Sequence, residues 1–109
     1  MNTLHLDNNY LLENDITIEV DNYVNNNNLA ILLIDWSEGD PDRLESLTIN
    51  LGVKLPNDYA IVDIVNLPEI ENFIEENNLG KPTGVVYPYG YSIYPEYKFN
   101  INEVKKYSK

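Results

Sequence analysis

Residues 66–84, NLPEIENFIEENNLGKPTG, carry the clearest helix signal in the chain. Apolar residues recur there at spacings of three and four, which places them along one side of a helix: Leu67, Ile70, Phe73 and Ile74. Asn66 followed by Glu69 matches a capping box. Asn77, Asn78 and Gly80 are candidates for a left-handed stop, and Pro82 prevents continuation. The sequence therefore predicts a helix over about residues 67–78, with a glutamate-rich exposed side.

Strand patterns surround this helix. Residues 15–24 alternate, which predicts a half-buried strand with an acidic outer face. The run Asn25–Asn28 tolerates positive φ and is typical of a hairpin connection to residues 29–36, an apolar run expected of a central strand. In residues 44–51 the alternation predicts Leu47, Ile49 and Leu51 inward and Ser46, Thr48 and Asn50 outward. Residues 59–65 predict a further strand.

The segment after the helix is aromatic. Residues 85–101 read VVYPYGYSIYPEYKFNI, and Pro88, Gly90 and Pro95 are expected to break them into short strands and turns. The sum is an α+β fold: an antiparallel sheet of about four to six strands with one helix packed on one face. We expect a single domain over residues 1–109, with residues 1–14 as an N-terminal arm or edge strand and residues 102–109 as a tail that frays.

Composition excludes several kinds of chemistry. The chain has no cysteine and only one histidine, His5, so a disulfide framework, a thiolate site or a histidine-based triad is not expected. No phosphate loop is present, and no apolar run reaches the roughly 18 residues of a membrane span. We expect a non-enzymatic protein of the cytoplasm, without cofactor or metal and without membrane contact.

Charge is distributed unevenly along the chain. The net charge is −11; residues 1–80 hold 16 acidic side chains against Arg43 and Lys54, whereas residues 81–109 hold five lysines against Glu96 and Glu103. Such a balance disfavours direct binding to nucleic acid, which depends on basic side chains, and favours a basic protein partner. Solubility alone is the simpler interpretation of the same charge.

Two local clusters could bind a ligand. Asp35, Glu38, Asp40 and Asp42 crowd one loop, but their spacing does not match an EF-hand, so a solvated turn is preferred over a cation site. Tyr87, Tyr89 and Tyr91 could stack on bases, pack within strands or contact a protein; given the acidic charge, protein contact is favoured over nucleic acid.

Several stretches together resemble a known family. They are NNLAILL (27–33), EGDP (38–41), LTINL (47–51), FIEENNLGKPTG (73–84) and YSIYPEYKF (91–99), in this order. This pattern is similar to a small single-domain family of unknown function carried by bacterial plasmids, conjugative elements and phages. The resemblance implies no catalytic residue. It implies a mobile-element context, in which small acidic proteins often counter host defence.

Charge and resemblance together suggest an acidic inhibitor of a host defence nuclease, either anti-CRISPR or anti-restriction. Such an inhibitor would act as a nucleic-acid mimic on the basic surface of a Cas effector or restriction enzyme. The carboxylates predicted to contact the partner are Glu19, Asp21, Asp35, Glu38, Asp40, Asp42, Glu71, Glu75 and Glu76. The alternative is an interaction or assembly module of the mobile element that acts through its tyrosine strands, with a homodimer as one form of it. Mimicry requires the carboxylates to share one face, which only the structure can test.

Overall fold

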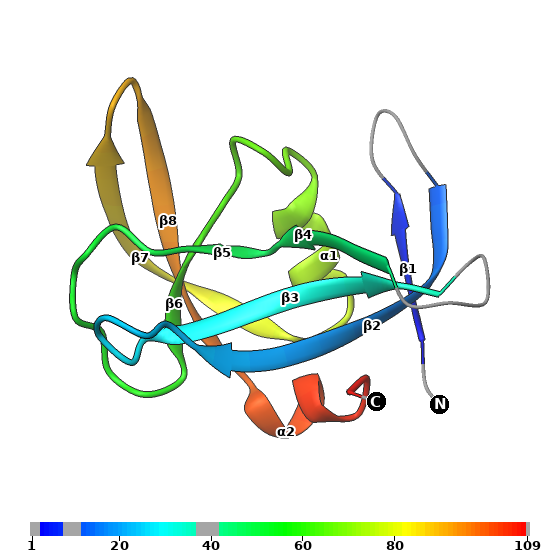
Figure 1. Cartoon of the computed structure of the whole chain (residues 1–109). Coiled ribbons are helices and arrows are strands. Elements are labelled where there is room, and N and C mark those ends of the chain that lie inside the picture. Colours follow the sequence, from blue (N-terminus) through cyan, green and yellow to red (C-terminus); the bar gives the residue numbers. More distant parts are fainter. Residues whose placement is uncertain (1–2, 8–11, 37–41, 109) are drawn as a thin grey trace.

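The computed structural model describes residues 3–7, 12–36 and 42–108 (Figure 1). A first antiparallel sheet has the strand order β1–β2–β3–β4, with β1 (Leu4–Asp7), β2 (Leu12–Asn22), β3 (Leu29–Asp35) and β4 (Asp42–Ser46). A second has the order β5–β6–β8–β7, with β5 (Thr48–Ile49), β6 (Tyr59–Val62), β7 (Gly80–Tyr89) and β8 (Ser92–Phe99). The helices are α1 (Ile70–Glu76) and α2 (Ile101–Lys105). The predicted α+β class is confirmed, with more strands than expected.

The predicted strand over residues 44–51 is divided between the two sheets. The chain changes sheet at Leu47, which is fully buried: its N–H donates to Ile31 O at 2.8 Å, and its carbonyl accepts from Asp63 N at 3.0 Å. The outward orientation predicted for Thr48 is wrong. Thr48 is buried, and its hydroxyl accepts from Ile31 N and lies 3.0 Å from the Tyr23 hydroxyl. A threonine can be buried when its hydroxyl is hydrogen-bonded, as here. The alternation of polar and apolar residues alone does not distinguish such a threonine from one that faces solvent.

One large hydrophobic cluster joins both sheets and both helices. It includes Ile18 and Leu33 from the first sheet, Tyr97 from the second, Ile74 from α1 and Val104 from α2. A smaller cluster of Leu55, Ile61 and Tyr94 covers the other face of the second sheet. The second sheet therefore has a main-core face and an outer face, and each strand residue belongs to one of them.

The helix α1 buries the predicted stripe but begins later than expected. Asn66 does not cap it, because the backbone N–H and Nδ2 of Asn66 donate to the buried carboxylate of Asp63, at 3.3 and 2.8 Å. Glu69 occupies the cap position and makes no side-chain cap bond. The end is as predicted: Asn78 has φ 61°, its N–H donates to Glu75 O, and Leu79 N–H donates to Ile74 O at 2.9 Å. This pair of bonds is a Schellman stop with asparagine at the left-handed position.

Strands β7 and β8 form one long hairpin, so the prediction of short, broken strands is wrong. Gly90, at φ 62°, lies in the turn as expected. Pro82 and Pro88 are tolerated because β7 is the edge strand of its sheet, where missing N–H groups disrupt no further ladder. Pro95 lies beyond the β6 ladder, which reaches β8 only between Glu96 and Lys98.

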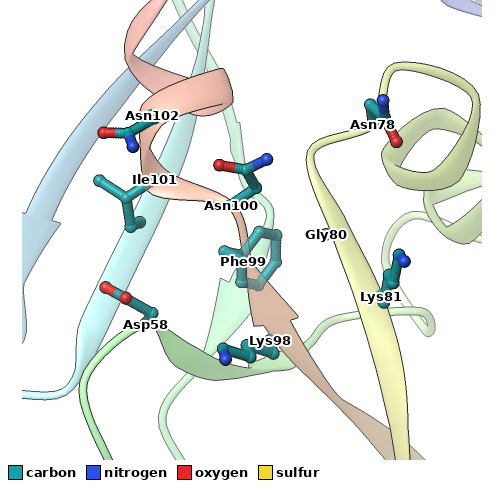
Figure 2. A pocket seen from close by; sticks show the side chains of 9 residues that line it. All are labelled: Asp58, Asn78, Gly80, Lys81, Lys98, Phe99, Asn100, Ile101 and Asn102. Carbon is teal, nitrogen blue, oxygen red and sulfur yellow. The ribbon is translucent and has the colours of Figure 1, made fainter.

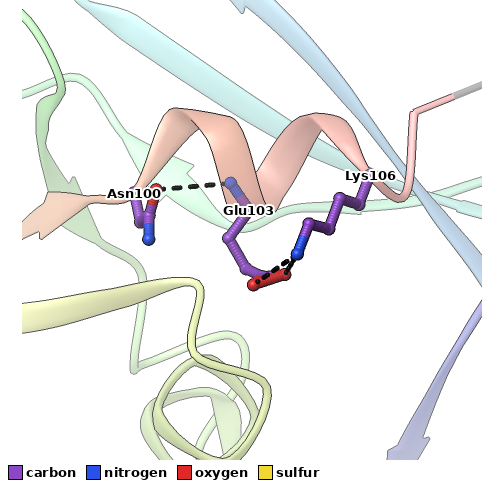
Figure 3. A network of polar contacts seen from close by, with 3 residues as sticks. All are labelled: Asn100, Glu103 and Lys106. Atoms are coloured by element: carbon purple, nitrogen blue, oxygen red, sulfur yellow. Dashed lines mark hydrogen bonds and ion pairs between the residues drawn. The ribbon is translucent and has the colours of Figure 1, made fainter.

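The first and last described elements both lie against β2 of the first sheet. The predicted N-terminal edge strand is present as β1, at the edge of that sheet. The tail expected to fray instead forms α2: Asn100 Oδ1 accepts from Glu103 N at 3.3 Å, and the Lys106 ammonium lies 3.0 Å from the Glu103 carboxylate (Figure 3). Tyr107 O then accepts from Ile18 N of β2 at 3.0 Å, which holds the tail against the sheet. Neither helix in the described part of the chain is long and apolar enough to cross a membrane.

Candidate interaction surfaces and a polar pocket

The acidic residues of β2 face away from α1. Ile16 and Ile18 point into the main core together with the buried side of α1. Since neighbouring strand residues point to opposite faces, Glu19 and Asp21 lie on the other face of the first sheet, where both are exposed. Glu19 and Asp21 therefore do not share a face with the carboxylates of α1, as mimicry through all of them would require.

The acidic loop is described only at its ends. Asp35, half-buried, closes β3 and lies opposite Asp42, the first residue of β4. Glu38 and Asp40 lie outside the described residues. Among the residues that are described, no group of three potential ligands is close enough to hold a metal ion.

The carboxylates of α1 are partly brought together by a buried tyrosine. Tyr97 is fully buried, and its hydroxyl donates to Glu71 Oε1 at 2.8 Å, with Glu75 Oε2 at 3.4 Å. Burial first, and then the bonds and charges of the two glutamates, raise the pKa of Tyr97 well above its usual range. Glu76, one residue further, is exposed. The helix therefore presents two neighbouring carboxylates, of which Glu71 is held in place by the Tyr97 hydroxyl.

The three predicted tyrosines have different environments. Tyr89 and Tyr91 are 61% and 110% exposed at the end of the hairpin. Tyr87 is half-buried, and its hydroxyl donates to Glu96 Oε2 at 2.7 Å. That bond, burial and the negative charge of Glu96 raise the pKa of Tyr87 to about 12. Tyr87 is therefore tied to β8 within the hairpin, and its contact with a partner stays a prediction.

A bulge in β7 surrounds the Glu96 carboxylate, which sequence reasoning missed. Pro82 pairs with Tyr97 and Val86 with Pro95, so residues 83–85 of β7 face the single residue Glu96. Glu96 is only 6% exposed, and Thr83 Oγ1 donates to its Oε1 at 2.8 Å. Gly84, at φ +90°, provides the backbone conformation that the bulge needs. The carboxylate thus fixes the point at which the hairpin leaves the sheet.

Beyond this bulge the hairpin is a two-stranded ribbon with an exposed apolar face. The register pairs Val86 with Pro95 and Pro88 with Ile93, so these four side chains share one face, which we call the ribbon face. Val86 is 54% exposed and Ile93 58%. In Figure 1 the turn of the hairpin projects beyond the second sheet. Sequence reasoning selected tyrosines here; the missed signal is that residues 84–95, GVVYPYGYSIYP, contain no charged residue.

The ribbon face continues the main-core face of the second sheet. Pro95 and Tyr97 alternate onto the same face of β8, and Tyr97 lies in the main core under α1. The helix covers this face only near Tyr97, while the ribbon extends past it. An apolar face that begins inside the core therefore ends uncovered in solvent.

A pocket lined mainly by polar residues lies at the other end of the same hairpin (Figure 2). Its volume is about 410 Å³. Nine residues line it: Asp58, Asn78, Gly80, Lys81, Lys98, Phe99, Asn100, Ile101 and Asn102. Gly80 lets the strands approach, because a Cβ there would lie 2.9 Å from Lys98 O and 3.2 Å from Phe99. The sequence does not indicate this pocket, since its lining comes from three separate segments: residue 58, residues 78–81 and residues 98–102.

Comparison with known proteins identifies the family. No curated protein and no solved structure is significantly similar to this chain. Residues 17–109, most of the chain, match a family described as a domain of unknown function, DUF4313. The match includes every element from β3 to α2 and the second half of β2, residues 17–22. The chain therefore belongs to the DUF4313 family, an uncharacterised family built on this domain.

Proposed function

We propose that this protein is a non-enzymatic binding module that seats its ribbon face in an apolar site on a positively charged protein. The exposure of Val86 and Ile93 on one face of a projecting ribbon carries this proposal. Exposed apolar patches of this kind mark interaction sites, because burying them is favourable and leaving them in water is not.

The contacts within the ribbon stabilise it only weakly. A hairpin of two strands is marginally stable in water, and the ribbon has no third strand beyond Glu96. Its base is held by the Glu96 bonds and by Tyr94, which is 8% exposed. Three of the four side chains on its apolar face, Val86, Pro88 and Ile93, are exposed. A partner surface would bury that face and stabilise the ribbon at the same time.

Charge complementarity supports a basic partner. The whole chain carries −11, whereas residues 84–95 carry no charge. An uncharged ribbon can enter an apolar site without desolvating an ion, and the acidic remainder of the molecule can attract a basic protein over roughly a Debye length of 8 Å. A second copy of this chain would bring two strongly acidic surfaces together, so self-association is disfavoured.

The test uses matched aspartate substitutions. Tagged wild type, Ile93→Asp and Val65→Asp are incubated with host extract; Val65 is 50% exposed and lies outside the ribbon, so it controls for an added charge on an exposed valine. The proposal expects capture of a basic protein by wild type and Val65→Asp and its loss with Ile93→Asp. Equal capture by all three forms, or a dimer in light scattering that Ile93→Asp abolishes, contradicts it.

A second candidate, supported by the Tyr97 bond to Glu71, is inhibition of a host defence nuclease. In this candidate α1 presents carboxylates to the basic nucleic-acid-binding surface of a Cas effector or restriction enzyme. Tyr97 holds one of two neighbouring charges in place, which reduces the entropy lost on binding. The mimic would be limited to the α1 side of the molecule, since Glu19 and Asp21 face elsewhere.

Cleavage assays distinguish this candidate. A panel of Cas effectors and restriction enzymes is assayed with wild type, Glu71→Gln combined with Glu75→Gln, and Glu19→Gln combined with Asp21→Asn as the control of equal charge. Inhibition that only the α1 pair weakens, and that falls with rising salt, supports the candidate. Inhibition unaffected by both double variants, or absent with every enzyme, counts against it.

A further inference from the structure

We infer that the pocket between β7, β8 and α2 binds a small phosphate-type oxyanion through Lys81 and Lys98. These two lysines lie directly opposite each other in the β7–β8 register and both line the pocket. Directly opposed residues have Cβ atoms about 5 Å apart, and like charges at that position destabilise a strand pair. An oxyanion between them would replace repulsion with attraction.

The two lysines lack acidic partners in the part of the chain that the structure describes. Within residues 3–7, 12–36 and 42–108, the Lys98 ammonium lies over an aromatic ring, with Nζ 6.0 Å from the centre of the Tyr59 ring. The nearest acid on the same face of β8 is Glu96, two residues away, and its carboxylate accepts the Thr83 and Tyr87 hydroxyls instead. Two lysines at directly opposed register positions, neither with a carboxylate partner among the described residues, are unexpected in a chain with 18 acidic and seven basic residues.

The rest of the lining is suited to an anion. Asn78, Asn100 and Asn102 place three side-chain amides around the pocket, and an amide can donate to an oxyanion. Asn100 already uses its Oδ1 for Glu103 N, which leaves its NH₂ as the group available to a ligand. Asp58, the one acidic residue of the lining, lies on the β6 side of Lys98, away from Lys81 (Figure 2). An anion therefore fits at the β7 side of the pocket.

The number of donors around the pocket favours phosphate chemistry over a carboxylate. In Figure 2 the two ammonium groups point to opposite sides, and each lies on a flexible four-carbon stem that can turn toward the pocket. Two ammonium groups and up to three amides provide more donors than the two oxygens of a carboxylate accept well, whereas phosphate has more oxygens and up to two charges. The volume of about 410 Å³ falls within the range of small-molecule sites, so a phosphomonoester also fits.

The test is a titration of the intact chain, followed by backbone amide NMR shifts at constant ionic strength. The probes are inorganic phosphate and adenosine monophosphate, with sodium chloride as the non-specific anion. We expect saturable shifts around Gly80, Lys81 and Lys98 with phosphate. Tighter binding of adenosine monophosphate than of inorganic phosphate would show that the site also contacts the adenosine group. Shifts that grow linearly without saturation, or equal shifts with chloride, overturn the inference.

Matched variants locate the site. Lys81→Gln and Lys98→Gln should each weaken phosphate binding about two- to fivefold, the range for exposed ion pairs. Lys105→Gln removes the same charge from an exposed position on α2 outside this pocket and should leave the affinity unchanged. Asp58→Asn should strengthen binding by removing a nearby negative charge. Equal weakening by Lys105→Gln and Lys81→Gln would show a response to net charge alone and would refute the site.

Discussion

Val86 lies directly across the ribbon from Pro95, on the face of β8 that carries the buried Tyr97 two residues further along. The same face is thus core at one end and solvent-exposed at the other. The bulge at Glu96 lies between the two regions and ties β7 to β8 through Thr83 and Tyr87. This arrangement lets a strongly acidic molecule present an uncharged apolar surface on a firmly anchored hairpin.

Removing the Tyr97 hydroxyl should destabilise the fold modestly. Tyr97→Phe keeps the buried ring and deletes the bond to Glu71, so the free energy of unfolding should fall by about 0.5–1.5 kcal/mol. Tyr89→Phe is the control, because Tyr89 is exposed and should change stability by less than about 0.5 kcal/mol. Urea denaturation measures both, and equal stability of the two variants would contradict a contribution from this bond.

The Tyr87–Glu96 bond should produce a stability loss at alkaline pH. The pKa of Tyr87 is raised from 10.0 to about 12 in the folded chain, so its neutral form is favoured by folding. The corresponding stabilisation is complete below about pH 10 and is lost as the pH rises to about 12. In Tyr87→Phe the decline in unfolding free energy over this interval should be shallower than in wild type. Parallel declines in the two proteins would show that Tyr87 does not contribute.

The stop of α1 should depend on the conformation of Asn78. Its φ of 61° is tolerated by glycine and costs an alanine about 1–2 kcal/mol. Asn78→Ala should therefore lower the denaturation midpoint, while Asn78→Gly should preserve it. Similar midpoints for the two variants would mean that the left-handed position is not required.

Close approach at Gly80 should make any side chain costly there. The Cβ of Gly80→Ala would lie 2.9 Å from the backbone oxygen of Lys98, and backbone cannot move as a flexible side chain does. We expect a loss of about 1–3 kcal/mol in unfolding free energy, as in overpacked cores. Wild-type thermal stability in Gly80→Ala would show that the two strands can separate without cost.

Local signals in the sequence predicted the local parts of this fold. The asparagine run predicted the hairpin before β3, and Asn27 has φ 62° there. The stop at Asn78 and the buried stripe of α1 were likewise found, because each depends on neighbours within a few residues. The start of α1 was not predicted correctly. Asn66 donates to the Asp63 carboxylate instead of capping the helix, and the capping pattern does not include Asp63.

Long-range features could not be predicted from the sequence. The change of sheet at Leu47 depends on hydrogen bonds to Ile31 and Asp63, which are distant in the sequence. The alternation of polar and apolar residues does not show where a strand passes from one sheet to another. Pro88 and Pro95 suggested broken strands because the sequence does not reveal which strand is an edge or where a neighbouring ladder ends. The separation of Glu19 from α1 is a property of the layers and likewise required the structure.

The most direct test of the account is the affinity of the captured basic protein, once purified, for wild type, Ile93→Asp and Val65→Asp. If the ribbon face is the centre of the interface, Ile93→Asp should raise the dissociation constant about 30-fold or more, the scale of an interface hot spot. The Val65→Asp control should remain within about twofold of wild type, as expected of a residue outside the interface, and all three proteins should unfold at the same temperature. A dissociation constant for Ile93→Asp that matches wild type would contradict the central claim.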